Sequence, residues 1–244
     1  MAGNGKIALD PRLSMIATMV GNCACYADIG CDHGRLGAFL LQNGRCGRAV
    51  LTDISDKSLK KARTLMDNLG LVERVCFAVG DGAKALAEPV DVVVIAGMGG
   101  TTIAGILREG RQQLGDARLL LQPNVGAPEL REALCACGYA ITDERVVQDA
   151  GRNYVIIQAE LGKADYSPKQ TVVGPVLLER MPPELLPYAQ FRLRVAKRRS
   201  RGPRPPGTRR RSRRWRRRSR SGRRCWHVCN GSAGDGAGER HRAL

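Results

Sequence analysis

Three aspartates each stand where an apolar run of the chain ends. Asp28 closes the first run, Asp53 closes the run that begins at Ala49, and Asp81 follows the third run. The carboxyl ends of neighbouring parallel strands line one crevice, so these carboxylates are expected to surround a single ligand. Asp53 can accept hydrogen bonds from both hydroxyls of a ribose, and Asp81 from an adenine amino group. The spacing therefore predicts a ligand that contains adenosine.

The turn after the first run decides which adenosine-containing ligand fits. Gly30 permits a sharp bend and a close approach to the backbone, but Asp32 replaces the second glycine of a G-x-G-x-x-G dinucleotide motif. Together with Asp28, this carboxylate repels a diphosphate, which disfavours NAD, FAD and ATP. S-adenosylmethionine carries a cationic ammonium and sulfonium, and the ammonium can form charge-assisted hydrogen bonds with Asp28 or Asp32. The alternative is that both aspartates only cap the next helix.

Alternating strands and helices are needed to bring these residues together. The apolar pattern predicts an amphipathic first helix from Pro11, strands near 24–29, 48–53, 74–79, 90–96 and 117–122, and helices near 34–43, 56–69, 101–113 and 128–137. Strands that alternate with helices in this way form a parallel sheet. Two β-rich runs, Tyr139–Val147 and Asn153–Leu161, follow without an intervening helix and predict an antiparallel hairpin. The expected fold class is α/β, a Rossmann-like doubly wound sheet of five parallel strands plus the terminal hairpin, seven strands in all.

Composition limits the class of protein further. The chain has 244 residues and a net charge of +17, but residues 197–244 hold 18 Lys and Arg against 2 Asp and Glu, so the remainder is nearly neutral. Its nine cysteines form no C-x₂-C pair, which predicts reduced thiols and no metal site. No signal peptide or long apolar run is recognisable. A cytoplasmic protein without a membrane partner is expected.

Four motifs carry a family resemblance. They are Pro11-Arg12-Leu13, Asp28-Ile29-Gly30-Cys31-Asp32-His33-Gly34, Ile95-Ala96-Gly97-Met98-Gly99-Gly100-Thr101 and Leu121-Gln122-Pro123-Asn124. In this order they resemble the bacterial tRNA adenine N1-methyltransferases that act on adenine 22 of the D-arm. The resemblance implies a class I fold with S-adenosyl-L-methionine as cofactor, tRNA as partner, and a small C-terminal helical appendage that helps to hold tRNA. It assigns cofactor binding to Asp28, Gly30, Asp32, His33, Asp53, Asp81, Gly97 and Met98, and the neighbours Ile54, Gly82 and Ala96 complete the predicted cofactor site.

Methylation of adenine N1 needs no general base, because N1 already offers an in-plane lone pair. Catalysis then depends on positioning. Asn124, beside Gln122 and Pro123 just after the fifth predicted strand, is expected to hold the base edge through its donor and acceptor, although Pro-Asn could also form a plain turn. Gly99 and Gly100 would let the backbone approach the base, or simply connect a strand to a helix.

His33 is the third predicted catalytic residue, with Asn124 and Asp32. Its ring can donate to the cofactor carboxylate or to a substrate phosphate; the alternative is that it only fixes the turn through a backbone bond. Arg35 stands where the family often has an aromatic residue, so stacking of the target base is not expected there. The predicted phosphate contacts are Arg35, Arg145 and Arg152, although single surface arginines are often only solvated.

Three domains and three functions follow from these patterns. Residues 1–162 are the predicted methyltransferase domain, 163–199 a linker and a shortened helical appendage, and 200–244 a disordered arginine-rich tail. The polar, glycine-containing residues 162–174 predict the linker, and the apolar pattern predicts helices at Pro175–Arg180 and Pro183–Arg199. The tail is either an RNA-binding arm or an out-of-frame terminus. Besides tRNA methylation, another class I methyltransferase acting on ribosomal RNA, protein or a small molecule remains open, as does a non-catalytic RNA-binding protein. No pattern indicates an oligomeric state.

Overall fold

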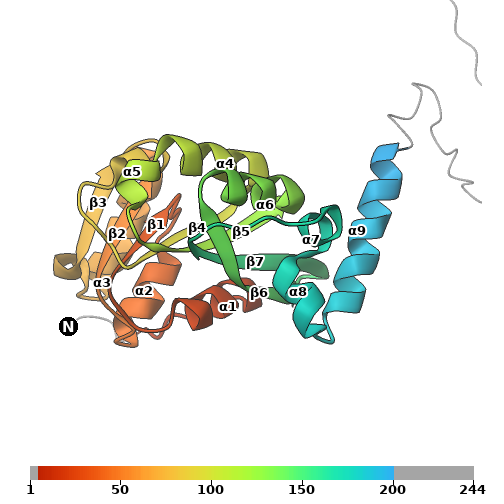
Figure 1. Ribbon diagram of the computed structural model, residues 1–244. Helices are drawn as coiled ribbons and strands as arrows, with labels where there is room; N and C mark the ends of the chain where they lie inside the picture. The colour runs from red at the N-terminus through yellow and green to blue at the C-terminus, as the bar shows by residue number, and fades with distance from the viewer. Residues whose placement is uncertain (1–4, 201–244) are drawn as a thin grey trace, which may run out of the picture. The chain divides into compact units, whose positions relative to one another are not determined.

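Seven strands form one sheet in the order β3-β2-β1-β4-β5-β7-β6 (Figure 1). The computed structural model describes residues 5–200. The strands are β1 (Cys23–Ile29), β2 (Cys46–Asp53), β3 (Val75–Val79), β4 (Val92–Gly99), β5 (Arg118–Val125), β6 (Tyr139–Asp149) and β7 (Arg152–Leu161). Strands β1 to β5 pair in parallel, whereas β7 is antiparallel to both β5 and β6. The predicted parallel sheet with a terminal hairpin is confirmed.

The direction in which strands are added reverses at β1. This strand pairs with β2 on one side and with β4 on the other. In an open α/β sheet such a reversal leaves a crevice outside the carboxyl ends of the two strands, because the connections leave in opposite directions. The fold therefore puts the natural ligand site where β1 and β4 end.

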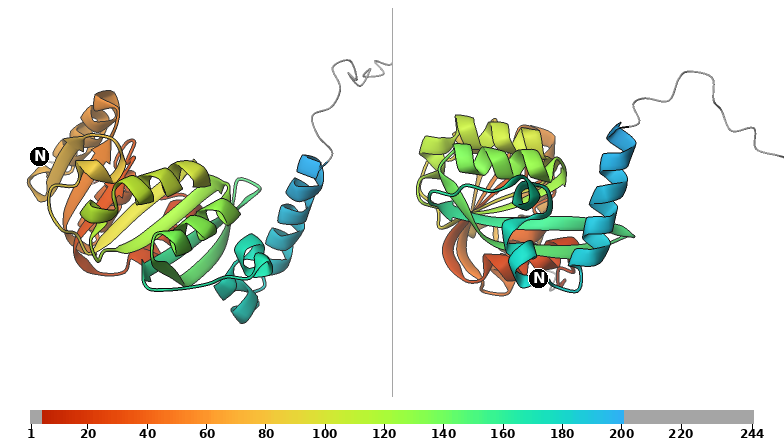
Figure 2. Two further views of the ribbon diagram at one scale, coloured as in Figure 1. Left: turned by 45° about the horizontal axis from the view of Figure 1, so that its top comes forward. Right: turned by 45° about the vertical axis from the view of Figure 1, so that its right-hand side comes forward.

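Helices cover both faces of the sheet (Figures 1 and 2). One face packs against α1 (Pro11–Val20), α2 (Arg35–Gln42) and α3 (Asp56–Asn68), and the other against α4 (Gly100–Glu109), α5 (Arg111–Leu114) and α6 (Ala127–Ala136). Short 3-10 turns, η1 (Val72–Arg74) and η2 (Gly82–Ala85), flank β3. The C-terminal helices of the described chain are α7 (Pro168–Val173), α8 (Pro175–Arg180) and α9 (Leu185–Ser200). None of the helices within residues 5–200 is long and apolar enough to cross a membrane.

Each face of the sheet has its own hydrophobic core. Along β4, Val92 and Val94 join the core under α1–α3, whereas Val93 and Ile95 join the core under α4–α6. All four side chains are at most 1% exposed. A central strand covered on both faces needs apolar residues at every position, which explains the uninterrupted apolar run in the sequence.

One helix and two strands differ in their bounds from the sequence prediction. The helix expected over 101–113 is divided at Gly110, where an added Cβ would lie 2.3 Å from the Cβ of Ala83. Glycine at this position lets η2 pack closely against the end of α4. In addition, β4 and β5 continue to Gly99 and Val125, beyond the ends expected at 96 and 122. The backbone pairing of β4 with β5 continues beyond the apolar runs of the two strands. The apolar pattern therefore could not predict these strand ends.

The linker expected over 162–174 contains a helix, α7. Ser167 and Gln170 form a capping box at its start, in which each side chain bonds the backbone of the other residue. Two of the three C-terminal helices, α8 over Pro175–Arg180 and α9 beyond it, are close to those predicted. The domain boundary at residue 162 stays a prediction, and the arginine-rich tail lies outside the described residues.

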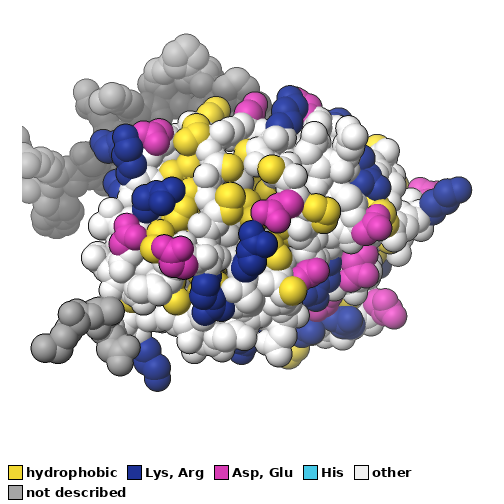
Figure 3. Space-filling view, turned by 90° about the vertical axis from the view of Figure 1, so that its left-hand side faces the viewer, with side chains coloured by type: hydrophobic (Ala, Val, Ile, Leu, Met, Phe, Trp, Pro, Cys, Tyr) yellow, Lys and Arg dark blue, Asp and Glu magenta, His cyan; other side chains and the backbone are white. Residues whose placement is uncertain are grey.

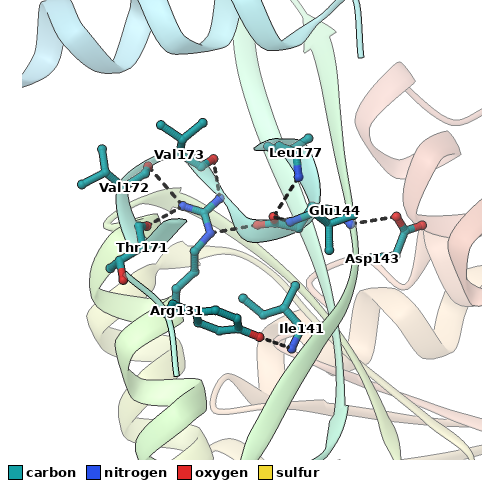
Figure 4. A network of polar contacts seen from close by, with 10 residues as sticks. Arg131, Ile141, Asp143, Glu144, Thr171, Val172, Val173 and Leu177 are labelled. Atoms are coloured by element: carbon teal, nitrogen blue, oxygen red, sulfur yellow. Dashed lines mark hydrogen bonds and ion pairs between the residues drawn. The ribbon is translucent and has the colours of Figure 1, made fainter. Parts of the chain in front are cut away.

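A buried ion pair joins α7 and α8 to the sheet (Figure 4). The Nε of Arg131, on α6, lies 2.8 Å from Oε1 of Glu144, on β6, and both side chains are fully buried. Their other partners are backbone groups: Arg131 donates to the carbonyls of Thr171, Val172 and Val173, and Glu144 accepts from the amides of Val176 and Leu177. The pair thus satisfies the last carbonyls of α7 and the first amides of α8, which no intrahelical bond can reach.

Only the first part of α9 contacts the core. Leu185 and Tyr188 are buried in the core under α4–α6, and Phe191 packs against it. Leu193 is 55% exposed, and the helix extends away from the sheet beyond this point (Figure 2).

Removing one member of the buried pair should be costly. Arg131→Met leaves the Glu144 carboxylate buried without its counterion, and we expect the free energy of unfolding to fall by about 3–5 kcal/mol. Combining it with Glu144→Gln should restore part of this loss, because the glutamine oxygen still accepts from the α8 amides. Urea denaturation measures the free energy of unfolding of the single and the double variant, and Arg145→Met is the control. Because Arg145 makes an exposed ion pair with Asp143, this control should lose about 1 kcal/mol or less of that free energy. Equal effects of Arg131→Met and Arg145→Met would contradict the assignment.

Candidate functional site

A pocket of about 270 Å³ opens at the carboxyl ends of β1 and β4. The residues that line it come from α1, from the end of β1, from the following turn with the start of α2, and from β4. They are Arg12, Leu13, Asp28, Cys31, Asp32, His33, Arg35, Leu36, Ala96 and Gly97. Six of the residues predicted from sequence for the cofactor or substrate therefore share one cavity. We call this cavity the acidic pocket, because two aspartates lie in it.

The turn after β1 is held close to its neighbours. Gly30 has a φ of 77°, and a Cβ at this position would stand 2.2 Å from Cε of Met98. The amides of Gly30 and Cys31 both donate to the carbonyl of Thr52, at 2.8 and 3.0 Å. Asp32 also has a positive φ, 49°, which is uncommon for a residue with a side chain. The bend therefore brings the backbone to the pocket wall, where a larger residue than glycine would displace Met98.

Asp53 contacts this turn from the end of β2. Its Oδ2 accepts from the amide of Asp32 at 3.2 Å, and its Oδ1 accepts from the amide of Ser55 at 2.8 Å. Each carboxylate oxygen can accept a second hydrogen bond, so both remain able to bind a pair of hydroxyls. Ile54, next in the chain, is 74% exposed. An exposed apolar side chain beside Asp53, the acid predicted to bind ribose, suits the face of an adenine ring.

Asp28 is buried at the floor of the pocket, 6% exposed. Burial and, to a smaller extent, the charge of Asp53 raise the pKa of its carboxyl to about 7, although Arg12 opposes the shift. A buried carboxylate becomes easier to ionise when a cation lies beside it. The floor of the pocket is therefore suited to a positively charged group and unsuited to a phosphate.

Comparison with known proteins agrees with this chemistry. A family model described as a methyltransferase domain matches residues 9–157. The tRNA (adenine(22)-N(1))-methyltransferase of Bacillus subtilis (strain 168) is 35% identical over 162 residues, which cover 66% of this chain and 68% of that protein. The chain belongs to this methyltransferase family. The resemblance inferred from the four sequence motifs is confirmed.

Solved structures of the family superimpose on the methyltransferase. The crystal structure of the Bacillus subtilis m1A22 tRNA methyltransferase matches with a TM-score of 0.72 and 31% identity, covering 78% of this chain and 85% of that one. A Streptococcus pneumoniae protein, a candidate tRNA (m1A22) methyltransferase solved in complex with S-adenosyl-L-methionine, matches with a TM-score of 0.71 and 32% identity, covering 74% of this chain and 86% of that one. At these identities both fold and family are shared.

His33 links the acidic pocket to α3. Its Nδ1 lies 2.6 Å from Oδ2 of Asp32, and its Nε2 lies 3.2 Å from Nζ of Lys61. An ammonium only donates, so both contacts are satisfied when Nε2 accepts from Lys61 and Nδ1 donates to Asp32. Both alternatives for His33 from the sequence thus stay open, since it fixes the turn and also lines the pocket.

Arg12 is a site residue that sequence reasoning did not single out. Its Nη1 donates to Oε1 of Gln122 at 2.6 Å, although the two residues are 110 positions apart. Gln122 donates in turn to Oδ1 of Asn124 at 3.2 Å, and Asn124 donates to the carbonyl of Gly97 at 2.6 Å. The guanidinium also stands over the ring of Tyr154 on β7. In the sequence, only the Pro11-Arg12-Leu13 motif pointed to Arg12. The sequence of a single helix does not indicate which strand end that helix will contact.

The structure corrects the alternative that Pro123 and Asn124 form a turn. Both lie within β5, where Pro123 pairs with Met98 and the register with β4 shifts twice. The irregular pairing places the exposed Asn124 side chain on the carbonyl of Gly97. Gly100, the first residue of α4, would bring a Cβ within 2.0 Å of the carbonyl oxygen of Gly126. Its glycine is therefore explained by backbone packing.

Several predicted residues lie outside the lining of the acidic pocket. Asp81 is exposed, and Gly82, with a φ of 58°, packs against Ile106 of α4. Arg145 is exposed on β6 and held by Asp143, and Arg152 is exposed at the start of β7. The roles predicted for these residues remain predictions. Among residues 5–200, no cluster of three or more His, Cys, Asp or Glu side chains is arranged to hold a metal ion.

The raised pKa of Asp28 makes the stability of the ligand-free protein depend on pH. Its carboxyl ionises near pH 4 in the unfolded chain but near pH 7 in the folded one, so the unfolded state is favoured as the pH rises from about 4 to 7. Asp28→Asn removes this penalty. We expect the variant to unfold less readily than the wild type at pH 8, by up to about 4 kcal/mol, with the difference vanishing towards pH 4. Urea denaturation at both pH values tests this, and a wild type as stable as Asp28→Asn at pH 8 would refute it.

Proposed function

We propose that this methyltransferase transfers the methyl group of S-adenosyl-L-methionine to N1 of adenine 22 in tRNA. The observation that carries the proposal is the 35% identity to the Bacillus subtilis enzyme over 162 residues, and the methyltransferase model that matches residues 9–157 spans the whole lining of the acidic pocket. The partner is then tRNA, and the cytoplasm is the expected compartment. The alternative methyltransferase substrates considered above have no comparable support.

The residues present fit this cofactor. Asp28 and Asp32 supply carboxylates for the methionine ammonium, Asp53 has one free acceptor site on each oxygen for the ribose hydroxyls, and Ile54 offers an apolar surface for adenine. When bound, the cofactor supplies an electrophilic methyl group on a sulfonium. A diphosphate in the same position would face these two carboxylates, which disfavours NAD and ATP even though Arg12 and Arg35 also line the pocket.

Base recognition is assigned to Asn124. Its Oδ1 already accepts from Gln122 and its amide already donates to Gly97, so one lone pair and one N–H remain. These suit the N6 and N7 edge of adenine, the pairing that asparagine makes with this base elsewhere. Such a contact leaves N1 unobstructed, and its in-plane lone pair can attack without prior loss of a proton. Arg12 and Gln122 act as positioning residues, because they fix which end of the Asn124 amide donates.

The C-terminal helices are proposed to hold the tRNA body. The family model ends at residue 157, before α7, α8 and α9. The exposed part of α9 carries Arg194 and Lys197, which suit contacts to phosphates. This division, with catalysis in residues 1–162 and an appendage from 163, is the domain organisation that the sequence suggested.

Nucleoside analysis tests the proposed function. Total tRNA incubated with the full chain and labelled cofactor should yield N1-methyladenosine, detected by mass spectrometry. Asn124→Ala should lower kcat/KM for tRNA about 10- to 100-fold, in line with the loss of a bidentate base contact of about 1–3 kcal/mol. Asn68→Ala, an exposed position on α3, is the matched control and should leave kcat/KM unchanged. Label in N6-methyladenosine, or in no tRNA nucleoside at all, would refute the proposal.

A further inference from the structure

A second cavity lies beside the acidic pocket, and the two share His33 and Arg35. Its volume is about 630 Å³, and its lining consists of Lys6, Ile7, Ala8, His33, Arg35, Lys61 and Leu65. Three of these side chains are permanently cationic, and none of the described lining residues is acidic. We call this cavity the basic groove. The acidic pocket has both aspartates and arginines in its lining, whereas the basic groove has no acidic side chain among its described residues, so the groove is the better site for a polyanion beside the pocket.

The N-terminal segment that forms one wall of the basic groove is held in place by α2. The side chain of Gln42 accepts from the amide of Ile7 at 3.1 Å and donates to the carbonyl of Gly5 at 3.1 Å. Arg35 donates to the carbonyl of Ala8. These bonds lie on both sides of Lys6 in the chain, so its backbone is fixed at the rim of the groove.

The opposite wall comes from α3. Lys61 and Leu65 are one helical turn apart and so lie on the same face of this helix. The contact between Lys61 and Nε2 of His33 anchors the lysine at the boundary between the two cavities. Lys6, Arg35 and Lys61 therefore reach the groove from three separate elements, which chance exposure of lysines along one helix would not produce.

On the face of the molecule that carries β3, basic and acidic side chains are interspersed with apolar ones (Figure 3). The described lining of the basic groove, in contrast, contains no acidic side chain. A single-sign groove beside a catalytic pocket concentrates a negatively charged substrate where it is needed.

We propose that the basic groove binds the sugar–phosphate backbone of the tRNA strand that carries the target adenine. This inference rests on the proposed function, since the acidic pocket must hold the methyl donor. Lys6, Arg35 and Lys61 contact phosphates, and Ile7 and Leu65 contact the apolar faces of the nucleotides between them. The target base can then turn from the groove into the acidic pocket past His33, where its extrusion from the stack is offset by these contacts.

The experiment measures tRNA binding by the full chain at several salt concentrations. The double variant Lys6→Ala/Lys61→Ala should bind tRNA about tenfold more weakly, and the slope of log affinity against log salt should fall by about 2, one for each lost phosphate contact. The charge-keeping variant Lys6→Arg/Lys61→Arg should retain most of the affinity. The matched control Lys57→Ala/Lys84→Ala removes two exposed lysines outside both the groove and the proposed appendage, and it should change the slope less. The arginine-rich tail contributes equally to every variant, so the differences report the groove.

Two further measurements separate the possible failures. Cofactor affinity, measured by calorimetry, should be the same in the single variant Lys6→Ala as in the wild type, whereas Lys61 also contacts His33 and is a less suitable position for this comparison. If the wild type forms N1-methyladenosine but the double alanine variant binds tRNA with unchanged affinity and salt slope, the groove is not the backbone site. If the wild type forms no N1-methyladenosine, the proposed function itself fails and the groove proposal fails with it. If the double alanine variant loses both cofactor affinity and tRNA binding, tRNA binding by Lys6→Arg/Lys61→Arg separates the two causes. If that arginine variant also fails to bind tRNA, the proposal is wrong.

Discussion

The structure depends on one electrostatic constraint, the burial of the Asp28 carboxylate where β1 and β4 separate. A charge at this depth is unfavourable unless a cation accompanies it, and in the ligand-free protein Arg12 and the protonation of Asp28 itself meet this requirement only in part. In the proposed function, the methionine ammonium of the cofactor supplies the missing charge. Arg12 also donates a hydrogen bond to Gln122, which in turn donates to Asn124. The proposed cofactor site and the proposed base site are therefore joined through the side chain of Arg12.

Much of the fold and part of the site could be predicted from the sequence. Strand ends in a parallel sheet lie at one edge whatever the details of packing, which is why Asp28, Asp32, His33 and Gly97 were grouped correctly. Contacts between elements far apart in sequence could not be predicted, because a single amphipathic helix does not show which strand end it will reach. Arg12 reaches Gln122 because of the way α1 packs. Lys6 lines the same groove as Lys61 because the hydrogen bonds of Gln42 hold the N-terminal segment there. The end of β5 was missed for another reason: Pro123 and Asn124 favour turns locally, and tertiary pairing with β4 overrides that preference.

The buried pair of Arg131 and Glu144 adds polar contacts to the apolar ones that fix the C-terminal helices to the sheet, where Val176, Leu177 and Leu185 are buried in the core. Its partners are the ends of two short helices, α7 and α8, whose unpaired carbonyls and amides would otherwise lack hydrogen bonds. Neither helix is long enough to be stable alone. Because α9 follows directly, the same pair also sets the direction in which the proposed tRNA-binding appendage leaves the sheet.

The pH dependence of cofactor binding tests the central claim most directly. If the cationic cofactor binds beside ionised Asp28, its affinity should rise about tenfold between pH 6 and pH 8, as the free carboxyl with a pKa of about 7 loses its proton. Calorimetry in buffers of different ionisation enthalpy should show proton release near pH 6.5, and Asp28→Asn should abolish both effects. Affinity that stays constant across this range without proton release, or a nucleoside diphosphate that binds the pocket more tightly than S-adenosyl-L-methionine, would contradict the account.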